Sequence, residues 1–264
     1  MRGVFKLGLI FMLIGVLLLI LAPLQLFGIY VFPPLAKRIP VFFHRTLLRL
    51  FGVRLNVEGE LEDGRPLLIV ANHVSWLDIV VMSAVAPVSF VAKEEMASWP
   101  LFGQLAWLQR TIFVKRQERR KSAEQANQIA QRLLKRESMV LFPEATTSDG
   151  LKLLPFKTTL FEAAKLALIE AEVEEAYVQP IAICYTHLHG LKLGIADMGH
   201  VAWPGEIGIG EHLFPLVAKG ALDVTVRIGP TVVLDHNSHR KSVAASAQDR
   251  IREMILLDSR TGTR

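Results

Sequence analysis

The residues with the clearest potential for chemistry are His73 and Asp78, five positions apart in the segment VANHVSWLD. An aspartate that accepts a hydrogen bond from one imidazole nitrogen sets the tautomer and leaves the other nitrogen free as a general base. Five positions along one continuous helix would turn the two side chains about 140° apart. We therefore expect His73 in a turn and Asp78 at the start of a helix. The competing interpretation is that Asn72 or Ser75 only caps this helix and that His73 has no role.

A second segment, LFPEATTSD at residues 141–149, begins with an apolar run that is typical of a strand. We expect Pro143 to end that strand, because proline cannot donate to a strand ladder. Glu144 then lies in the turn, beside small residues. The motif LPFK follows at residues 154–157. The alternative interpretation is an ordinary turn between a strand and a helix.

A third segment, TIFVKRQERR at residues 111–120, is basic. It predicts a strand that delivers Lys115 and Arg116 at its C-terminal end. The planar guanidinium of Arg116 suits a phosphate group. Lys93 stands at the end of another predicted strand, in FVAKEE.

Beyond Glu58 the pattern alternates between strands and helices and would bring these strand ends together. Apolar runs of strand type occur at residues 66–71, 88–92, 111–114, 139–142, 178–185 and 224–228. Helical patterns occur at residues 119–136, 158–170 and 241–257. This alternation predicts an α/β fold with a mostly parallel mixed sheet flanked by helices. Ligands usually bind at the C-terminal ends of the strands in such a sheet.

The charge of the chain is distributed unevenly. The net charge is +5, but seven basic and no acidic residues precede Glu58, so the remainder carries −2. A basic segment confined to one end argues against a nucleic-acid-binding domain. Apolar residues make up 51% and charged residues 21% of the chain, which excludes a disordered protein. The single cysteine, Cys184, excludes an intrachain disulfide.

An uncharged apolar run at residues 7–36 exceeds the length of about 20 residues that a helix needs to span a bilayer. A signal peptide would be shorter and would precede a small-residue cleavage site. Pro23 and Gln25 interrupt the run, so two interpretations stay open: one tilted span, or a helix–break–helix hairpin in one leaflet. The basic flanks place the following chain on the cytoplasmic face of the inner membrane in both cases.

Residues 39–57 alternate apolar side chains with arginine at helical spacing. They predict an amphipathic helix that lies at the membrane interface or packs on the following domain. We therefore expect an N-terminal membrane anchor with an interfacial helix at residues 1–56. The α/β domain is then expected at residues 57–264.

The motifs together, in their order along the chain, resemble those of the glycerolipid acyltransferase family, which includes 1-acylglycerol-3-phosphate O-acyltransferases. The family has an N-H-x4-D block, a G-x-I-F-x-x-R block, an F-P-E-G-T-[RS] block and a proline-centred V-P-V-x-I block. Here they correspond to His73 with Asp78, Phe113 with Arg116, the segment FPEATT, and Pro180 in VQPIAI. The resemblance covers about residues 57–252.

This resemblance implies an acyltransferase of phospholipid biosynthesis, with residues 57–264 as its catalytic domain. It would transfer a fatty acyl group from acyl-CoA or acyl carrier protein to lysophosphatidic acid, without an acyl-enzyme. His73 would be the general base and Asp78 would orient it. Substrate contacts are expected from the other motif residues and nearby basic side chains: Asn72, Lys93, Arg116, Glu144, Thr146 and Lys157. We expect no cofactor, no metal and no nucleic-acid partner.

Two residues depart from the family pattern in the third block. Ala145 replaces a glycine, from which we expect a turn that needs no left-handed backbone. Thr147 replaces an arginine, so one expected phosphate contact is missing. This keeps another lysolipid acceptor open, such as lyso-ornithine lipid. A membrane lipid-binding protein without turnover is the remaining alternative.

Overall fold

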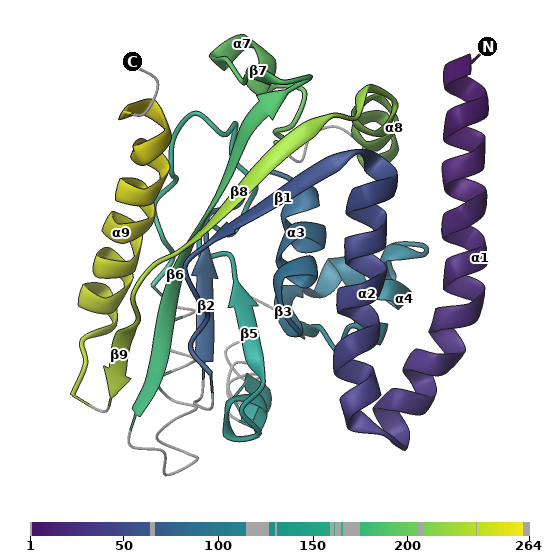
Figure 1. Ribbon diagram of the computed structural model, residues 1–264. Helices are drawn as coiled ribbons and strands as arrows, with labels where there is room; N and C mark the ends of the chain where they lie inside the picture. Colours follow the sequence, from purple (N-terminus) through teal and green to yellow (C-terminus); the bar gives the residue numbers. More distant parts are fainter. Residues whose placement is uncertain are drawn as a thin grey trace.

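The computed structural model describes residues 2–63, 67–114, 127–129, 131–158, 161, 165, 175–204, 208–235 and 237–260. Within these residues a mixed β-sheet lies between two groups of helices (Figure 1). The helices are α1 (Arg2–Tyr30), α2 (Pro33–Phe51), α3 (Leu77–Val85), the short 3-10 helix η1 (Glu94–Ser98), α4 (Phe102–Leu108), α7 (Ile195–Met198), α8 (Ile209–Lys219) and α9 (Arg240–Arg260). The strands are β1 (Val53–Glu58), β2 (Leu67–Ala71), β3 (Val88–Lys93), β4 (Ile112–Val114), β5 (Ser138–Leu141), β6 (Glu175–Leu188), β7 (Leu191–Lys192), β8 (Leu222–Ile228) and β9 (Val232–Asp235).

The strand order β1-β8-β6-β2-β5-β3-β4 confirms the predicted mostly parallel mixed sheet. Strands β6, β2, β5, β3 and β4 are parallel to one another, and β1 is parallel to β8. The antiparallel partners of β6 are β7, β8 and β9. Because β2 and β5 are parallel neighbours, the segments that follow them emerge at the same edge of the sheet.

The sheet separates two apolar cores. Leu67, Ile69 and Ala71 of β2 point into a core shared with α1, α2, α3 and α8. Leu68 and Val70 point into the opposite core, which α9 covers. A strand that is buried on both faces reads as a continuous apolar run, as the sequence of β2 does.

The structure describes the three predicted helical segments to different extents. Helix α9 confirms the pattern at residues 241–257. The pattern at 119–136 is helical at 127–129 and 131–134, and its remainder is mostly outside the described residues, as is most of 158–170.

The N-terminal region forms two antiparallel helices (Figure 1). The hairpin interpretation placed its break near Pro23 and Gln25, but α1 continues through both residues to Tyr30, as the single-span interpretation allowed. The chain reverses instead at Phe32, whose φ of −134° and ψ of 79° lie outside the helical region. Phe32 precedes Pro33, and the ring of a proline disfavours the helical conformation of the residue before it.

The predicted amphipathic helix ends earlier than expected. It stops at Phe51, where Gly52 takes a left-handed φ of +72° and donates its N–H to the carbonyl of Arg49. A glycine adopts this conformation easily and therefore ends helices. The next residues form β1, which pairs with β8, so the expected domain boundary between residues 56 and 57 falls inside a strand.

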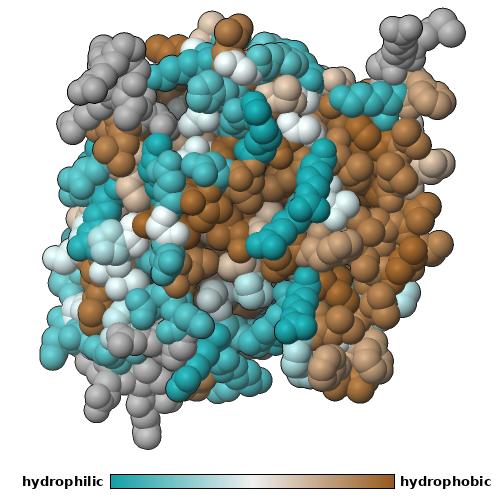
Figure 2. All heavy atoms as spheres, viewed as in Figure 1, coloured by the Kyte–Doolittle hydropathy of each residue, from teal (hydrophilic) through white to brown (hydrophobic). Residues whose placement is uncertain are grey.

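Helix α2 packs its apolar face on the domain, as one of the two interpretations held. The buried side chains of that face are Ala36, Ile39, Phe43, Leu47, Leu48 and Phe51. Helix α1 packs one side on the same core through Ile10 and the partly buried Leu7, Ile14, Leu17, Leu18 and Leu21. Its outer side exposes apolar residues, which form the brown surface at the right of Figure 2. The segment Phe5–Tyr30 contains an 18-residue window with a mean hydropathy of 2.9 and is long and apolar enough to cross a membrane.

Candidate active site

The first two motifs meet at the common edge of β2 and β5. The backbone N–H of Ser148 donates to the carbonyl of His73 at 2.8 Å, which joins the turn after β5 to the turn after β2. Asn72 fastens the same turn to β6, since its amide nitrogen donates to the Ile183 carbonyl at 3.0 Å and its oxygen accepts the Ile183 N–H at 2.8 Å. Asn72 is buried and contacts backbone, so these contacts give no support to a role in binding substrate.

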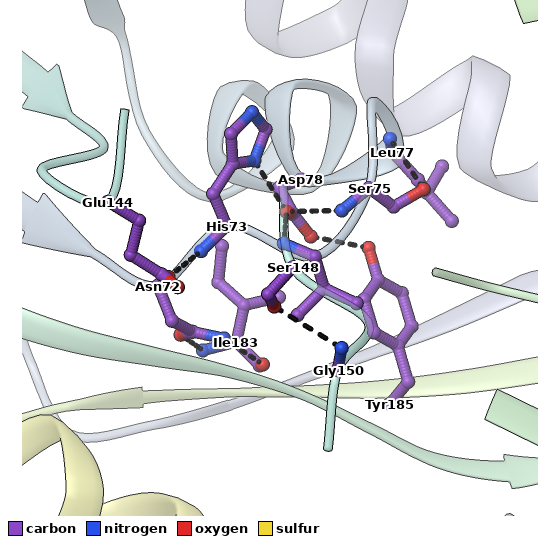
Figure 3. A network of polar contacts seen from close by, with 11 residues as sticks. Asn72, His73, Ser75, Leu77, Asp78, Glu144, Ser148, Gly150, Ile183 and Tyr185 are labelled. Carbon is purple, nitrogen blue, oxygen red and sulfur yellow. Dashed lines mark hydrogen bonds and ion pairs between the residues drawn. The ribbon is translucent and has the colours of Figure 1, made fainter. Parts of the chain in front are cut away.

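His73 and Asp78 adopt the geometry that the sequence predicts. His73 lies in the turn and Asp78 in the first turn of α3, and Nδ1 of His73 lies 2.8 Å from Oδ2 of Asp78 (Figure 3). The same Oδ2 accepts the backbone N–H groups of Val74 and Ser75 at 2.7 and 2.9 Å. Oδ1 of Asp78 accepts the hydroxyl of Tyr185 at 2.6 Å. The fully buried carboxylate of Asp78 therefore has four donors.

The imidazole of His73 is held in a defined orientation. A carboxylate facing Nδ1 favours the tautomer with the proton on that nitrogen, which leaves the Nε2 lone pair free. In Figure 3 the outer end of the ring points away from the polar network. The ring stacks on Phe142 at 4.1 Å between centroids, and the side chain is 17% exposed. The exposed part of His73 can therefore contact a substrate, while Asp78 fixes its tautomer and Phe142 fixes the plane of its ring.

Glu144 holds the backbone of His73 through a hydrogen bond (Figure 3). Its Oε1 accepts the backbone N–H of His73 at 2.7 Å, and its Oε2 accepts the N–H of Leu154 at 2.8 Å. Burial away from water raises the pKa of the Glu144 carboxyl to about 7, against the lowering effect of these two donors. The side chain is only 2% exposed. Glu144 thus sets the backbone position of His73, a role that the sequence did not predict, and its contact with the substrate stays a prediction.

Ala145 contradicts the expectation drawn from its side chain. Its φ is +67°, so the turn does use a left-handed backbone. The N–H of Ala145 closes a tight turn on the carbonyl of Phe142 at 3.1 Å, and this turn brings the following residues back to His73. A non-glycine residue in this conformation costs about 1–2 kcal/mol. Alanine has only one carbon to accommodate there.

The other predicted site residues that the structure describes differ in exposure. Thr146 is exposed, whereas Thr147 is buried. Lys157 is exposed, and its backbone N–H donates to the Pro143 carbonyl at 2.8 Å, beside Glu144. Lys93 is exposed at the C-terminal end of β3. Arg116 lies outside the described residues.

Tyr185 is a site residue that sequence reasoning treated only as part of an apolar strand. Its ring belongs to the same core as Trp76 and Leu77, on the face of β6 that is turned to α3. Burial, followed by the charge of Asp78, raises the pKa of the Tyr185 hydroxyl well above its usual range. The hydroxyl therefore remains a donor to Asp78. The tyrosine at the end of the VQPIAICY run was the only local signal, and its partner is 107 positions away.

Comparison with known proteins agrees with this chemistry. The acyltransferase family model matches residues 54–184. The chain is 49% identical to the lyso-ornithine lipid O-acyltransferase of Brucella abortus, over 83% of this chain and 82% of that protein. It is 44% identical to the protein of the same name from Rhizobium meliloti, over 92% and 84% of the two chains.

Two further relatives carry the name of the other substrate. The 1-acyl-sn-glycerol-3-phosphate acyltransferase of Neisseria meningitidis is 44% identical over 79% of each chain. The crystal structure of the 1-acyl-sn-glycerophosphate acyltransferase of Thermotoga maritima covers 100% of both chains with a TM-score of 0.64 and 16% identity. That likeness shows that the fold is shared. The chain belongs to the glycerolipid acyltransferase family and is an acyltransferase.

Proposed function

We propose that this enzyme transfers a fatty acyl group from acyl-CoA or acyl carrier protein to a hydroxyl of lyso-ornithine lipid. The observation that carries the choice of acceptor is the 49% identity, over most of both chains, to a lyso-ornithine lipid O-acyltransferase. The site supports it as well. The motif position at which the family has an arginine holds Thr147, whose side chain is buried. An ornithine head group carries one carboxyl and one amino group instead of a phosphate, so it offers less negative charge for an arginine at this position to bind.

The proposed reaction uses the free nitrogen of His73. Nε2 takes the proton of the acceptor hydroxyl as its oxygen attacks the thioester carbonyl, and the imidazolium then returns that proton to the leaving thiolate. Asp78 stabilises the imidazolium, and four donors hold its carboxylate in place. General base catalysis of this kind contributes about 10²–10⁴-fold. Exposed Lys93 and Lys157 supply positive charge at the same edge for the carboxyl group or for the acidic donor.

Lysophosphatidic acid is the second candidate acceptor, and the 44% identical Neisseria relative favours it. The test is competition between purified lyso-ornithine lipid and lysophosphatidic acid in one reaction with a single acyl donor. We expect the acylated ornithine lipid to dominate the products at equal concentrations. Dominance of phosphatidic acid would reverse the assignment, and no product from either acceptor would contradict both.

The same enzyme is proposed to lie in one leaflet of the inner membrane, with its site at the cytoplasmic face. Helix α1 packs along the domain through Leu7, Ile10, Ile14 and Leu21, so a perpendicular span would carry the domain into the hydrocarbon. This favours the hairpin over the single span. Basic side chains of α2 also line an open groove of about 700 Å³, namely Lys37, Arg38, Arg45 and Arg49. They suit the phosphates of an anionic leaflet.

Topology is tested by labelling with a membrane-impermeant maleimide in sealed vesicles of both orientations. The variants are Arg2→Cys in α1 and Lys192→Cys in β7, and the native Cys184 is buried. We expect both introduced cysteines to react from the cytoplasmic side. Reaction of the two positions from opposite sides would restore the single span.

A further inference from the structure

Tyr185 reaches the His73–Asp78 pair from a different part of the fold. Oδ2 of Asp78 is occupied by Nδ1 of His73 and by two backbone N–H groups of the same turn. The other oxygen, Oδ1, receives only the Tyr185 hydroxyl among the described residues, at 2.6 Å. Tyr185 stands in β6, immediately before a shift in the register with β8. Such irregularities re-aim side chains next to active sites.

We propose that Tyr185 is a positioning residue: its hydroxyl holds Oδ1 of Asp78 and thereby keeps Oδ2 directed at the imidazole of His73. The inference rests on the proposed role of His73 as the base. Three of the four donors to Asp78 belong to its own turn, so they move with it. The fourth donor, the Tyr185 hydroxyl, belongs to β6. It links the Asp78 carboxylate to the strand whose residue Ile183 is hydrogen-bonded to Asn72.

The hydroxyl also moderates the charge of Asp78. A donor to Oδ1 draws negative charge toward that oxygen, and removing it strengthens the hold of Asp78 on a protonated imidazole. The hydroxyl cannot become an anion at working pH, because burial and the neighbouring charge raise the pKa of Tyr185 well above its usual range. Among the described residues, the other titratable group that acts on the pair is Glu144, from the turn after β5.

The test is Tyr185→Phe in the full-length protein, assayed with whichever lysolipid the wild type acylates. We expect kcat to fall about tenfold while KM changes less than about twofold, as for the loss of one charge-assisted hydrogen bond. The acid limb of the kcat/KM profile should move to higher pH by about half a unit. An unchanged profile with unchanged kcat would overturn the proposal.

Tyr177→Phe is the matched control. Tyr177 is in the same strand, is 9% exposed against 7% for Tyr185, and its hydroxyl donates to the carboxylate of Glu175. We expect this variant to keep the wild-type kcat and pH profile, whatever its change in thermal midpoint. Equal kinetic losses in both variants would mean that the effect is one of general stability, and this would contradict the proposal.

A double-mutant cycle tests whether the Tyr185 hydroxyl acts through Asp78. In single-turnover assays, Tyr185→Phe should reduce the residual rate of Asp78→Asn by less than about twofold, because the two changes share one interaction. A full tenfold loss in that background would refute positioning through Asp78. A wild-type enzyme that acylates neither lysolipid would contradict the proposed function, whereas an active wild type with a silent Tyr185→Phe contradicts only this inference.

Discussion

The common edge of β2 and β5, which carries His73 and Asp78, and the N-terminal hairpin of α1 and α2 use side chains in opposite ways. At the edge, each functional atom has a particular partner: Asp78 has four donors and Glu144 two, all between 2.6 and 2.9 Å. On the outer side of α1, large apolar side chains such as Leu19 are exposed. One region thus depends on individual atoms, and the other depends on apolar area and charge.

Gln25 is the exception inside the hairpin that makes the difference clear. It is 4% exposed, and its amide nitrogen donates to the carbonyls of Ala36 at 3.2 Å and Leu108 at 2.9 Å. This polar residue of the apolar run therefore joins α1 to α2 and α4 and does not interrupt the helix. The hairpin thus makes specific hydrogen bonds where it packs on the domain, and it exposes apolar side chains on its outer side.

The largest effect is expected from His73→Ala, which removes the proposed base. Acyl transfer should fall by about 10²–10⁴-fold, and binding to vesicles should stay unchanged because the anchor is untouched. His189→Ala, an exposed histidine after β6, is the control. Transfer at the wild-type rate in His73→Ala, measured with a radiolabelled donor, would exclude His73 from the reaction.

Leu19→Lys tests the other region. Leu19 is 77% exposed on α1, and a lysine at the centre of a membrane helix costs about 2.5–3.5 kcal/mol. The fraction bound in vesicle flotation should drop roughly a hundredfold, while kcat on detergent-dispersed substrate remains. Leu191→Lys changes an equally apolar residue, 75% exposed in β7, and should bind normally. Equal losses in both would show that attachment is not specific to α1.

Glu144→Gln places an amide nitrogen against one of two backbone N–H groups. One buried donor then loses its acceptor, which costs about 1–3 kcal/mol of stability. We expect kcat to fall about tenfold because the backbone of His73 shifts, with membrane binding intact. Glu253→Gln, an exposed change in α9, should alter neither. Chemical denaturation and steady-state kinetics measure both effects, and an unaltered kcat would limit Glu144 to a role in folding.

Arg38→Gln removes one charge from the basic groove of α2. Each basic residue near an anionic surface contributes about 1 kcal/mol, so binding to anionic vesicles should weaken about fivefold. Binding to neutral vesicles and kcat should stay the same. Arg252→Gln in α9 serves as the control. A loss that is equal on neutral and anionic vesicles would contradict a role for the charge.

Glu144 also predicts a pH dependence of stability. Its pKa is raised in the folded protein from 4.5 to about 7, so the folded state holds a proton that the unfolded state has released. This contribution is complete below about pH 4.5 and is lost as the pH rises to about 7. The unfolding free energy of the wild type should therefore fall through this window relative to Glu144→Gln. Parallel curves for the two proteins would contradict the raised pKa.

Much of the architecture followed from local patterns. The apolar runs that form β2, β3 and β5 predicted parallel strands. The motifs that follow these strands predicted that their side chains meet at one edge of the sheet. The His73–Asp78 contact was also predictable, because both residues belong to one turn and its helix. The sequence left open whether the helix breaks at Pro23. That proline lies within a continuous helix, whereas the residue before Pro33 takes a non-helical conformation.

The roles of Glu144, Ala145 and Tyr185 were missed for another reason. The residue type of Glu144 indicates a charge but not which donors will surround it after burial. The left-handed Ala145 depends on the turn that must return the chain to His73. The partner of Tyr185 is 107 positions away. Each role depends on a contact between segments that are distant along the chain.

The sequence by itself determined the periodicities, the order of the motifs, the residue types at the edge and the apolar, acid-free N-terminus, because these are local properties of the chain. Only the tertiary structure decided that α1 lies along the domain, that β1 joins the sheet, and that Asp78 takes its fourth donor from β6. The physical reason is the same in each case. Burial and pairing are properties of neighbours in space, and which neighbours a residue has is settled only when the sheet and its helices close around it.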